Sequence, residues 1–255
     1  MNGNISAVTF DLWDTIIVDE SDEPKRAARG LSSKFLTRRE LVRKFLENHE
    51  PVARELVDVS YAATDAAFRK VWYDHSFTWP VDGRLDIVLK GLGRTLPEGE
   101  MTELVRLHEE MEFEIQPDLA PGIVDAIKDL HGRYKLGVIS DTIFSSGRVL
   151  RRLLQANDIE KYFDVFIFSD EVGCSKPDPR TFLAAAKGLE VDITEIVHVG
   201  DRDTKDIKGP QSLGARGIYT TVVNDRGSSE TSADAICRDY ADLPAIVDSL
   251  NGAAS

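Results

Sequence analysis

The sequence is poor in cysteine and has no long apolar run. Its two cysteines, Cys174 and Cys237, do not lie at spacings typical of a zinc site or a disulfide framework. Nowhere do about 18 apolar residues follow one another, and no basic stretch followed by a long apolar one comes after Met1. We therefore expect a reduced, cytoplasmic protein with no membrane-spanning segment.

Positive charge is also scarce. The chain has 31 lysines and arginines against 44 aspartates and glutamates, so its formal net charge is -13. This excess of negative charge disfavours binding to nucleic acid or to an anionic membrane. A small molecule is therefore the expected partner, and the composition leaves open whether the protein is a monomer or a homodimer.

Five short apolar runs are present, each followed by a turn and then by a helical pattern. They cover residues 7–10, 136–139, 165–168, 196–199 and 217–221. This alternation is typical of a parallel sheet, because strands that are covered on both faces lose their polar positions. The sequence predicts a doubly wound, Rossmann-like α/β core with its ligand site beyond the carboxyl ends of the strands.

A long segment between the first two runs, residues 18–116, has helical periodicity and almost no strand signal. Its interruptions contain proline, often with other turn residues: Pro51, Pro80 with Asp82 and Gly83, and Pro97 with Gly99. We expect an inserted all-helical cap of about four helices over the mouth of the sheet. The catalytic core would then comprise residues 1–17 and 117–255.

Side chains suited to chemistry follow several predicted strands. Asp11 could act as a nucleophile that forms a covalent intermediate, and Ser140 could donate a hydrogen bond to a developing oxyanion. Lys176 lies in a proline-stiffened turn and could neutralise an anionic substrate. Taken alone, Asp11 and Ser140 also fit a turn or a helix cap, and Lys176 fits a solvated surface.

The fourth apolar run opens into an acidic loop. Asp201 follows the run, and Asp206 comes one helical turn later. Mg²⁺ prefers oxygen ligands and is commonly held by one or two carboxylates. We therefore expect Asp201 to be a Mg²⁺ ligand, with Asp206 supporting the site from behind.

In this order, the four motifs resemble those of the haloacid dehalogenase (HAD) superfamily. The resemblance is carried by Asp11 with Thr15, by Ser140, by Lys176, and by Gly200-Asp201 with Asp206. It covers the predicted core, and the insertion lies where this family places a helical C1-type cap.

The resemblance implies a Mg²⁺-dependent phosphomonoester hydrolase that forms an aspartyl-phosphate at Asp11. The Asp11 carboxylate, the Trp13 carbonyl and Asp201 would hold the metal, while Ser140 and Lys176 would bind the phosphoryl group. Closure of the cap would expel water from the reacting centre. Two further residues of these motifs, Thr15 and Asp141, are candidates for substrate binding.

One position departs from the phosphatases of this superfamily. They usually carry a second aspartate two residues after the nucleophile, where this chain has Trp13. An indole cannot serve as a general acid, a role typically worth about 10²–10⁴-fold. Asp14 comes next, but a shift of one residue at a strand end usually turns the side chain to the opposite side. Whether Asp14 replaces the missing acid is left open.

The aromatic Trp13 resembles the 2-haloacid dehalogenases of the same superfamily, which use the same aspartate without metal. Dehalogenase-type hydrolysis is therefore the alternative function. The chain lacks other residues that these enzymes typically carry, having Asp141, Phe182, Asp201 and Asp203 in their place. Four carboxylates, including Asp203, would also crowd one pocket, which favours a divalent cation there. A weakly catalytic or non-catalytic binding module is the further alternative, supported by the missing acid alone.

The start of the insertion reverses the overall charge. Residues 25–44 carry eight basic side chains against one acid, Glu40. Arg26 and Arg29 are candidates to pair with a carboxylate or phosphate of the substrate. A solvated helix face would explain the same pattern.

Overall fold

The computed structural model describes residues 4–252. The chain divides into two compact units, which we call the core unit and the helical unit. The core unit contains the chain up to Asp19, Pro117–Asp141, and the chain from Leu154 onward. The helical unit contains Glu20–Gln116 and Thr142–Leu153.

The helical unit thus includes a segment that the sequence-based boundaries place in the core. Within Thr142–Leu153, the Ser145 hydroxyl donates a hydrogen bond to Glu112, and Arg148 forms an ion pair with Glu109 at 3.1 Å. These polar contacts tie the segment to the end of the insertion. No apolar pattern in the sequence predicts these polar contacts.

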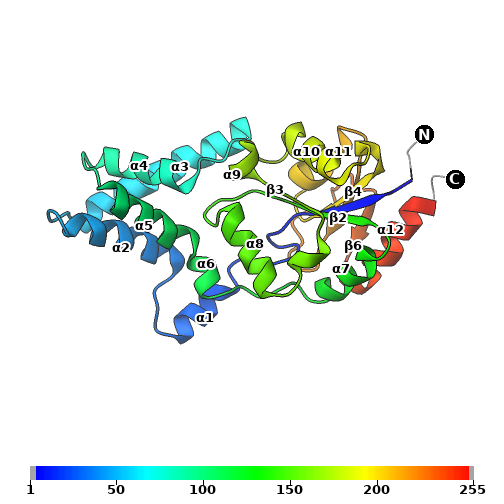
Figure 1. Cartoon of the computed structure of the whole chain (residues 1–255), viewed down its shortest axis with the longest axis horizontal. Coiled ribbons are helices and arrows are strands. Elements are labelled where there is room, and N and C mark those ends of the chain that lie inside the picture. The colour runs from blue at the N-terminus through cyan, green and yellow to red at the C-terminus, as the bar shows by residue number, and fades with distance from the viewer. Residues whose placement is uncertain (1–3, 253–255) are drawn as a thin grey trace. The chain divides into compact units, whose positions relative to one another are not determined.

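The core unit is built on a six-stranded sheet (Figure 1). In chain order its strands are β1 (Ala7–Phe10), β2 (Lys135–Ser140), β3 (Val165–Phe168), β4 (Ile196–Gly200), β5 (Arg216–Thr220) and β6 (Ala235–Cys237). They lie in the order β3-β2-β1-β4-β5-β6, and all neighbouring pairs are parallel. The sequence predicts a doubly wound fold, and this strand order is of that class. The order reverses between β1 and β4, where ligands usually bind in such sheets.

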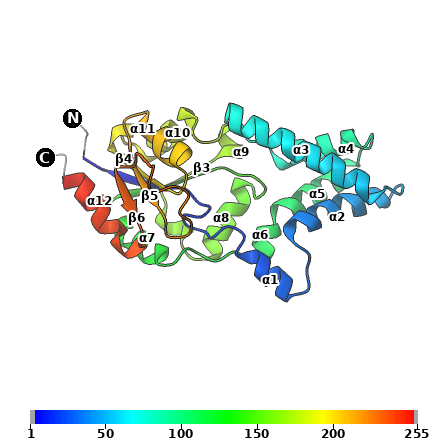
Figure 2. The same ribbon diagram turned by 180° about the vertical axis from the view of Figure 1, so that it is seen from behind.

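Helices cover both faces of this sheet. On one face lie α10 (Pro179–Leu189) and α11 (Gly209–Gln211), and on the other lie α7 (Ile123–His131) and α12 (Leu243–Gly252), as both ribbon views show (Figures 1 and 2). All residues of β1, β4 and β5 are therefore buried. Burial on both faces explains why these strands read as continuous apolar runs.

Shorter elements complete the core unit. They are α9 (Ser169–Val172), a π-helical turn (Asp203–Lys208), and three 3₁₀ turns (Glu160–Tyr162, Ile193–Glu195 and Tyr240–Asp242). Helix α8 (Gly147–Ala156) begins in the helical unit and ends in the core unit. Strand β6 escapes the sequence analysis because it has three residues, two of them only half-buried.

The two chain passages that join the core unit to the insertion run side by side. Ile17 and Leu119 form an antiparallel bridge, and the Val18 amide donates to the Asp118 carbonyl at 2.9 Å. The insertion thus leaves and re-enters the core unit at one place. Residues near the two ends of the chain also meet, because the Ile5 amide donates a hydrogen bond to Asn251 Oδ1 at 2.8 Å.

The helical unit contains α1 (Asp22–Ala28), α2 (Lys34–Glu47), α3 (Arg54–His75), α4 (Val81–Gly91), α5 (Glu98–Glu109) and α6 (Met111–Glu114). The four longer helices share an apolar core that includes Leu46, Tyr61, Leu85 and Leu104. Pro80 and Pro97 immediately precede α4 and α5, as their role as helix breakers predicts.

Asp82 and Gly83 do not form a turn, since both lie inside the first turn of α4. An acidic residue is favourable there because the first turn of a helix carries partial positive charge.

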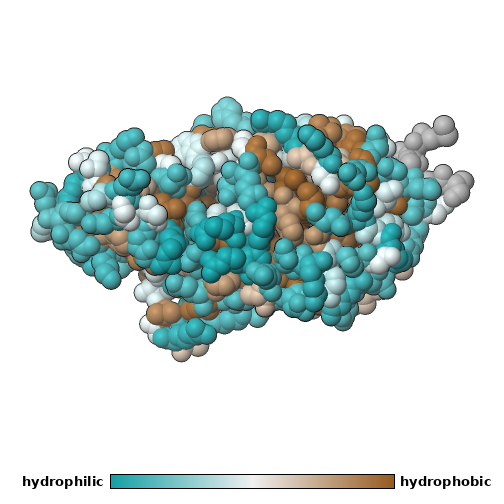
Figure 3. Space-filling view, viewed as in Figure 1, coloured by the Kyte–Doolittle hydropathy of each residue, from teal (hydrophilic) through white to brown (hydrophobic). Residues whose placement is uncertain are grey.

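Hydrophilic residues dominate the face shown in the space-filling view, with hydrophobic ones exposed in scattered patches (Figure 3). Among residues 4–252, no helix is both long and apolar enough to span a membrane.

Candidate active site

Three candidate residues come together at the carboxyl edge of the sheet. Asp11 directly follows β1, Asp201 directly follows β4, and Ser140 ends β2. These strands are neighbours in the order β2-β1-β4 and run parallel, so their carboxyl ends share one edge. Residues far apart in the sequence are thereby brought into one site.

Lys176 links two carboxylates at the centre of this site. Its Nζ donates to Asp11 Oδ1 at 2.7 Å and to Asp206 Oδ1 at 2.6 Å, and its side chain is 2% exposed. The other oxygen of the Asp11 carboxylate accepts no hydrogen bond from the described residues. One oxygen of Asp11 is therefore fixed by the lysine while the second is free to react.

The backbone of Lys176 is held in turn by Asp141. Asp141 Oδ1 accepts a hydrogen bond from the Lys176 amide at 2.9 Å, and Oδ2 accepts one from Lys205 Nζ at 2.7 Å. The sequence predicts that Asp141 binds substrate, and in the structure both oxygens of its carboxylate contact lysines of the protein. The turn ends at α10, whose N-cap Asp178 and first-turn Pro179 set the start of the helix.

Gly200 allows Asp206 to approach the end of β4. A Cβ atom added at Gly200 would lie 2.5 Å from Asp206 Cβ, closer than real contacts allow. Asp206 belongs to the π-helical turn, a rare element often found at functional sites. Its Oδ2 also accepts a hydrogen bond from the Arg202 amide at 3.0 Å. The glycine and the turn together place this carboxylate.

The carboxylates of Asp11, Asp201 and Asp206 could hold one metal ion. Each offers an oxygen, and these three oxygens lie within 4.8 Å of one another. Asp201 Oδ1 is buried and accepts no hydrogen bond, which is costly unless a cation is bound. Carboxylate oxygens are the ligands that Mg²⁺ prefers, so the residues present fit this ion.

Asp203 does not belong to this cluster, contrary to the expectation that four carboxylates crowd the pocket. Its carboxylate forms an ion pair with Lys208 at 2.6 Å and accepts a hydrogen bond from Thr231 Oγ1 at 2.6 Å. The π-helical turn directs Asp206 toward the site and leaves Asp203 on the loop side.

Burial and crowding change the acidity of these groups. Burial raises the pKa of Asp11 to about 7, with help from Asp206 and Asp201, although Lys176 opposes the shift. Burial and the Asp206 charge likewise raise the pKa of Asp201 to about 6. For Asp206, burial acts upward, but Lys176 and His198 hold its pKa below the usual range. Burial, with neighbouring carboxylates, therefore disfavours the ionised forms of Asp11 and Asp201.

The sequence matches a family model for haloacid dehalogenase-like hydrolases over residues 5–214. The chain belongs to this family. It is 29% identical over 132 residues to the glyceraldehyde 3-phosphate phosphatase of Methanopyrus kandleri, a match that covers 51% of this chain and 54% of the relative. The chain thus spans about half the length of the curated relatives it matches.

Solved structures of this family share the fold. A 2-haloacid dehalogenase from Pseudomonas syringae has a TM-score of 0.65 at 24% identity, over 96% of this chain and 99% of that one. A HAD phosphatase from Thermococcus onnurineus has a TM-score of 0.63 at 23% identity, over 95% of this chain and 98% of that one. At such identities, the likeness establishes the fold of this hydrolase alone.

Arg226 is a residue of the site that the sequence analysis misses. Its Nε donates to Asp201 Oδ2 at 2.5 Å, and its Nη2 donates to Asp14 Oδ2. It lies in a loop over residues 224–232 whose polar composition resembles any exposed loop. No spacing in the sequence distinguishes this arginine, because its contacts depend on where the loop folds back.

Asp14 shares the Arg226 guanidinium with Asp201. Its backbone has φ +56°, and its Oδ1 accepts a hydrogen bond from the Asp19 amide at 3.0 Å. This left-handed conformation turns the chain after Trp13, so simple strand alternation does not describe the direction of Asp14. Trp13 itself is half-buried beside Ile17, with which it forms an isolated bridge.

The remaining candidates in the core unit are buried. Ser140 Oγ makes one long hydrogen bond, of 3.4 Å, to the Asp141 carbonyl. Thr15 Oγ1 is buried without a partner, while the Thr15 carbonyl accepts a hydrogen bond from Tyr240 Oη at 2.7 Å. The Thr15 backbone thus makes a structural contact with Tyr240, and substrate binding by its hydroxyl stays a prediction.

The two arginines expected to bind substrate, Arg26 and Arg29, do not line the pocket that Arg84 lines in the helical unit. Arg26 is buried and donates to the Ser32 carbonyl at 3.1 Å and to Thr37 Oγ1 at 3.0 Å. Arg29 is exposed at the end of α1. Arg26 therefore ties α1 to the start of α2.

Proposed function

We propose that this hydrolase cleaves small phosphomonoesters with Mg²⁺ and forms an aspartyl-phosphate at Asp11. The observation that supports it most is the convergence of three buried carboxylates: Asp201 Oδ1 accepts no hydrogen bond and has only a long ion pair with Arg202, at 4.0 Å, and Asp11 has a raised pKa. A divalent cation would relieve both conditions.

The metal would be held by Asp11, Asp201 and the Trp13 carbonyl, with Asp206 beside them. When bound, Mg²⁺ would supply positive charge to the oxygens of the phosphoryl group. Ser140 would donate a hydrogen bond to the same group. Lys176 would neutralise Asp11 and orient it, since its Nζ already holds Asp11 Oδ1 at 2.7 Å.

In the first step, the free oxygen of Asp11 would attack phosphorus while the bond from phosphorus to the leaving oxygen breaks. The leaving oxygen would take a proton from water, because the nearby Asp14 carboxylate forms an ion pair with Arg226. In the second step, water would cleave the aspartyl-phosphate, releasing phosphate and regenerating the carboxylate. Curated relatives named as phosphatases support this choice of reaction.

A second candidate is hydrolysis of a 2-haloacid, which Trp13 favours because it stands where phosphatases usually carry an acid. The fold is also similar to that of a dehalogenase. This reaction would use Asp11 without metal. It would leave the buried oxygen of Asp201 unexplained.

The nucleophile is tested by a pair of aspartate variants. We expect Asp11→Asn to abolish Mg²⁺-dependent phosphate release, and Asp203→Asn to retain most of it. Asp203 lies outside the carboxylate cluster, where it binds Lys208 and Thr231. Phosphate release is measured with p-nitrophenyl phosphate, and circular dichroism verifies folding. Equal activity of the two variants would refute the proposed role of Asp11.

A further inference from the structure

The helical unit contains a partly open pocket of about 320 Å³, a size at the lower end of small-molecule sites. All of its lining residues belong to this unit, mainly to α2, α3, α4 and the segment Thr142–Leu153. Apolar and aromatic side chains form part of the wall, among them Phe35, Trp72 and Ile143. Neither Arg26 nor Arg29 lines it.

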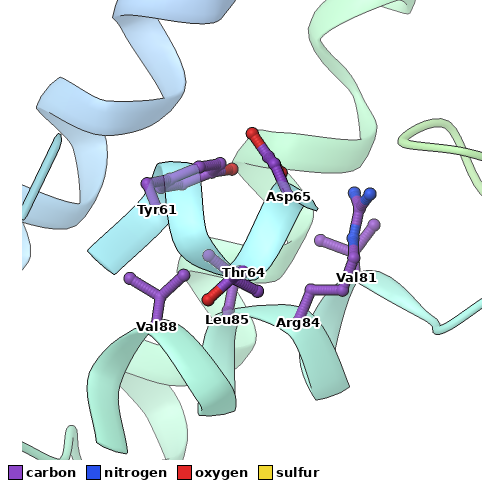
Figure 4. Close-up of a pocket in the computed structure, with 7 residues that line it drawn as sticks. All are labelled: Tyr61, Thr64, Asp65, Val81, Arg84, Leu85 and Val88. Carbon is purple, nitrogen blue, oxygen red and sulfur yellow. The ribbon is translucent and has the colours of Figure 1, made fainter. Parts of the chain in front are cut away.

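Arg84 is the unusual residue of this pocket. Its side chain is buried, with the residue 5% exposed, and it makes no hydrogen bond or ion pair with any described residue. Figure 4, a close-up of a smaller pocket that Arg84 also lines, shows it on α4 with its guanidinium group extending away from Leu85 and Val88. The Asp65 charge attracts it but forms no direct ion pair with it, and a buried guanidinium without a hydrogen-bonded counter-ion is costly to the fold.

The other buried basic residues of the pocket all have acidic partners. Lys34 pairs with Asp22 at 2.8 Å, Arg38 pairs with Glu112 at 2.8 Å, and Arg39 pairs with Asp65 at 3.4 Å. Asp65 and Arg84 line the same pocket, but no ion pair joins them. Arg84 therefore differs from its neighbours in having only the more distant charge of Asp65 and no direct ion pair.

Two aromatic rings hold the Arg84 guanidinium. Its central carbon lies 4.2 Å from the ring centre of Phe144 and 4.5 Å from that of Phe68. Cation–π contacts use the faces of the planar group and leave the in-plane N–H donors available. Burial lowers the pKa of Arg84 to about 10, so the group is still charged at pH 7. The side chain is thus oriented and charged, and its N–H donors make no hydrogen bond with the described residues.

We propose that this pocket binds a small organic anion whose carboxylate or phosphate pairs with Arg84. A guanidinium fork matches either group through two parallel hydrogen bonds. The neighbouring Phe35, Trp72 and Ile143 suit an apolar body attached to the charged group. The site does not depend on the proposed phosphatase activity, since its residues lie in the helical unit.

The test measures binding without catalysis. In an Asp11→Asn background without Mg²⁺, we would titrate 4-fluorobenzoate and 4-fluorophenylphosphonate and follow their ¹⁹F NMR signals. Arg84→Met should weaken the binding of at least one probe by about tenfold or more, because a charge-assisted pair is lost. Arg54→Met is the matched control, because Arg54 is exposed at the start of α3 and outside this pocket.

Folding is monitored in the same experiment. Arg84→Met should melt at or near the temperature of the parent, because it removes a buried charge that no direct ion pair compensates. If it does not fold, Arg84→Lys provides the comparison, since lysine keeps the charge without the planar fork. Unchanged binding in a folded Arg84 variant, or no binding of either probe to the parent at millimolar concentration, would overturn the proposal.

The source of the anion is resolved by kinetics of the otherwise unmodified hydrolase. If the anion is a second charged group of the substrate, Arg84→Met should raise the KM for phosphoesters that carry such a group. If it is a separate effector, the KM should stay constant while probe binding is lost. Either result supports the binding site and assigns its ligand.

Discussion

At the scale of single residues, the raised pKa values of Asp11 and Asp201 make a prediction about metal binding. Protons compete with Mg²⁺ for a carboxylate below its pKa, and these pKa values are about 7 and about 6. Both groups are ionised at pH 8 and become protonated as the pH falls through 7 and then 6. Mg²⁺ affinity should therefore fall across this window, by about tenfold per pH unit for each proton displaced.

Isothermal titration calorimetry at several pH values checks this expectation. Buffers of different ionisation enthalpy should also reveal proton release upon metal binding. Carboxylates of ordinary pKa, about 4, would be ionised throughout. A constant affinity between pH 8 and 5.5 would therefore contradict the crowded, buried environment described for Asp11 and Asp201.

Trp13 makes a second prediction at this scale. Without a general acid beside Asp11, expulsion of a basic alkoxide should be slow, while an aryl oxide needs little help. We expect the hydrolase to favour p-nitrophenyl phosphate over alkyl phosphates. Trp13→Asp should raise kcat for alkyl phosphates by about tenfold or more, and should change the aryl rate much less.

Steady-state kinetics on a series of leaving groups measures this difference. Trp13→Phe is the control, because it removes the indole without adding an acid. An equal effect of Trp13→Asp on alkyl and aryl substrates would mean that Asp14 already serves as the acid. Asp14 is the alternative to examine, since its carboxylate shares Arg226 with Asp201.

At the scale of elements, the tight packing of β4 against the π-helical turn makes a third prediction. Gly200→Ala would place a Cβ atom 2.5 Å from Asp206 Cβ. The turn must then shift, which should lower the free energy of unfolding by about 1–3 kcal/mol and weaken Mg²⁺ binding. Urea unfolding and calorimetry measure the two effects.

Gly83→Ala is the matched control for that substitution. Gly83 lies within α4, and an added Cβ atom would meet nothing within 4 Å. Alanine should stabilise the helix by about 0.5–1 kcal/mol and leave Mg²⁺ affinity unchanged. If Gly200→Ala bound Mg²⁺ as the parent does, Asp206 could not depend on the close approach to β4.

The sequence predicts elements well where burial is complete. The apolar runs locate β1 to β5 because both faces of these strands are covered, and the sheet order then gathers Asp11, Ser140 and Asp201 at one edge. It fails where position depends on how loops fold. Arg226 reaches Asp201 from a polar loop, and the turn after β4 directs Asp203 away from the cluster.

The basic stretch of the insertion shows a further limit of sequence analysis. The pattern suggests either a substrate-binding arginine or a solvated helix face. In the structure, Lys34, Arg38 and Arg39 are buried in ion pairs, while Arg29 and Lys44 of the same stretch are exposed. Charged residues can be buried when partners compensate them, and these partners come from positions that no periodicity connects.

At the scale of the whole molecule, the proposed catalytic residues and the proposed anion-binding residues belong to different units. The core unit holds a buried cluster of carboxylates and Lys176, and the helical unit holds a pocket with an unpaired arginine. The segment after β2 connects them in sequence, because Ser140 and Asp141 precede Ile143 and Phe144 of the pocket. A domain boundary drawn from the insertion alone places this segment in the core, whereas the compact units of the structure group it with the insertion.

The most direct test of the proposed function is a paired assay on one preparation of the unaltered protein. Phosphate release from a panel of phosphomonoesters is measured with Mg²⁺ and with EDTA, and halide release from a 2-haloacid is measured beside it. We predict phosphate release that requires Mg²⁺ and no halide release. Halide release that persists in EDTA, without phosphate release, would contradict the account.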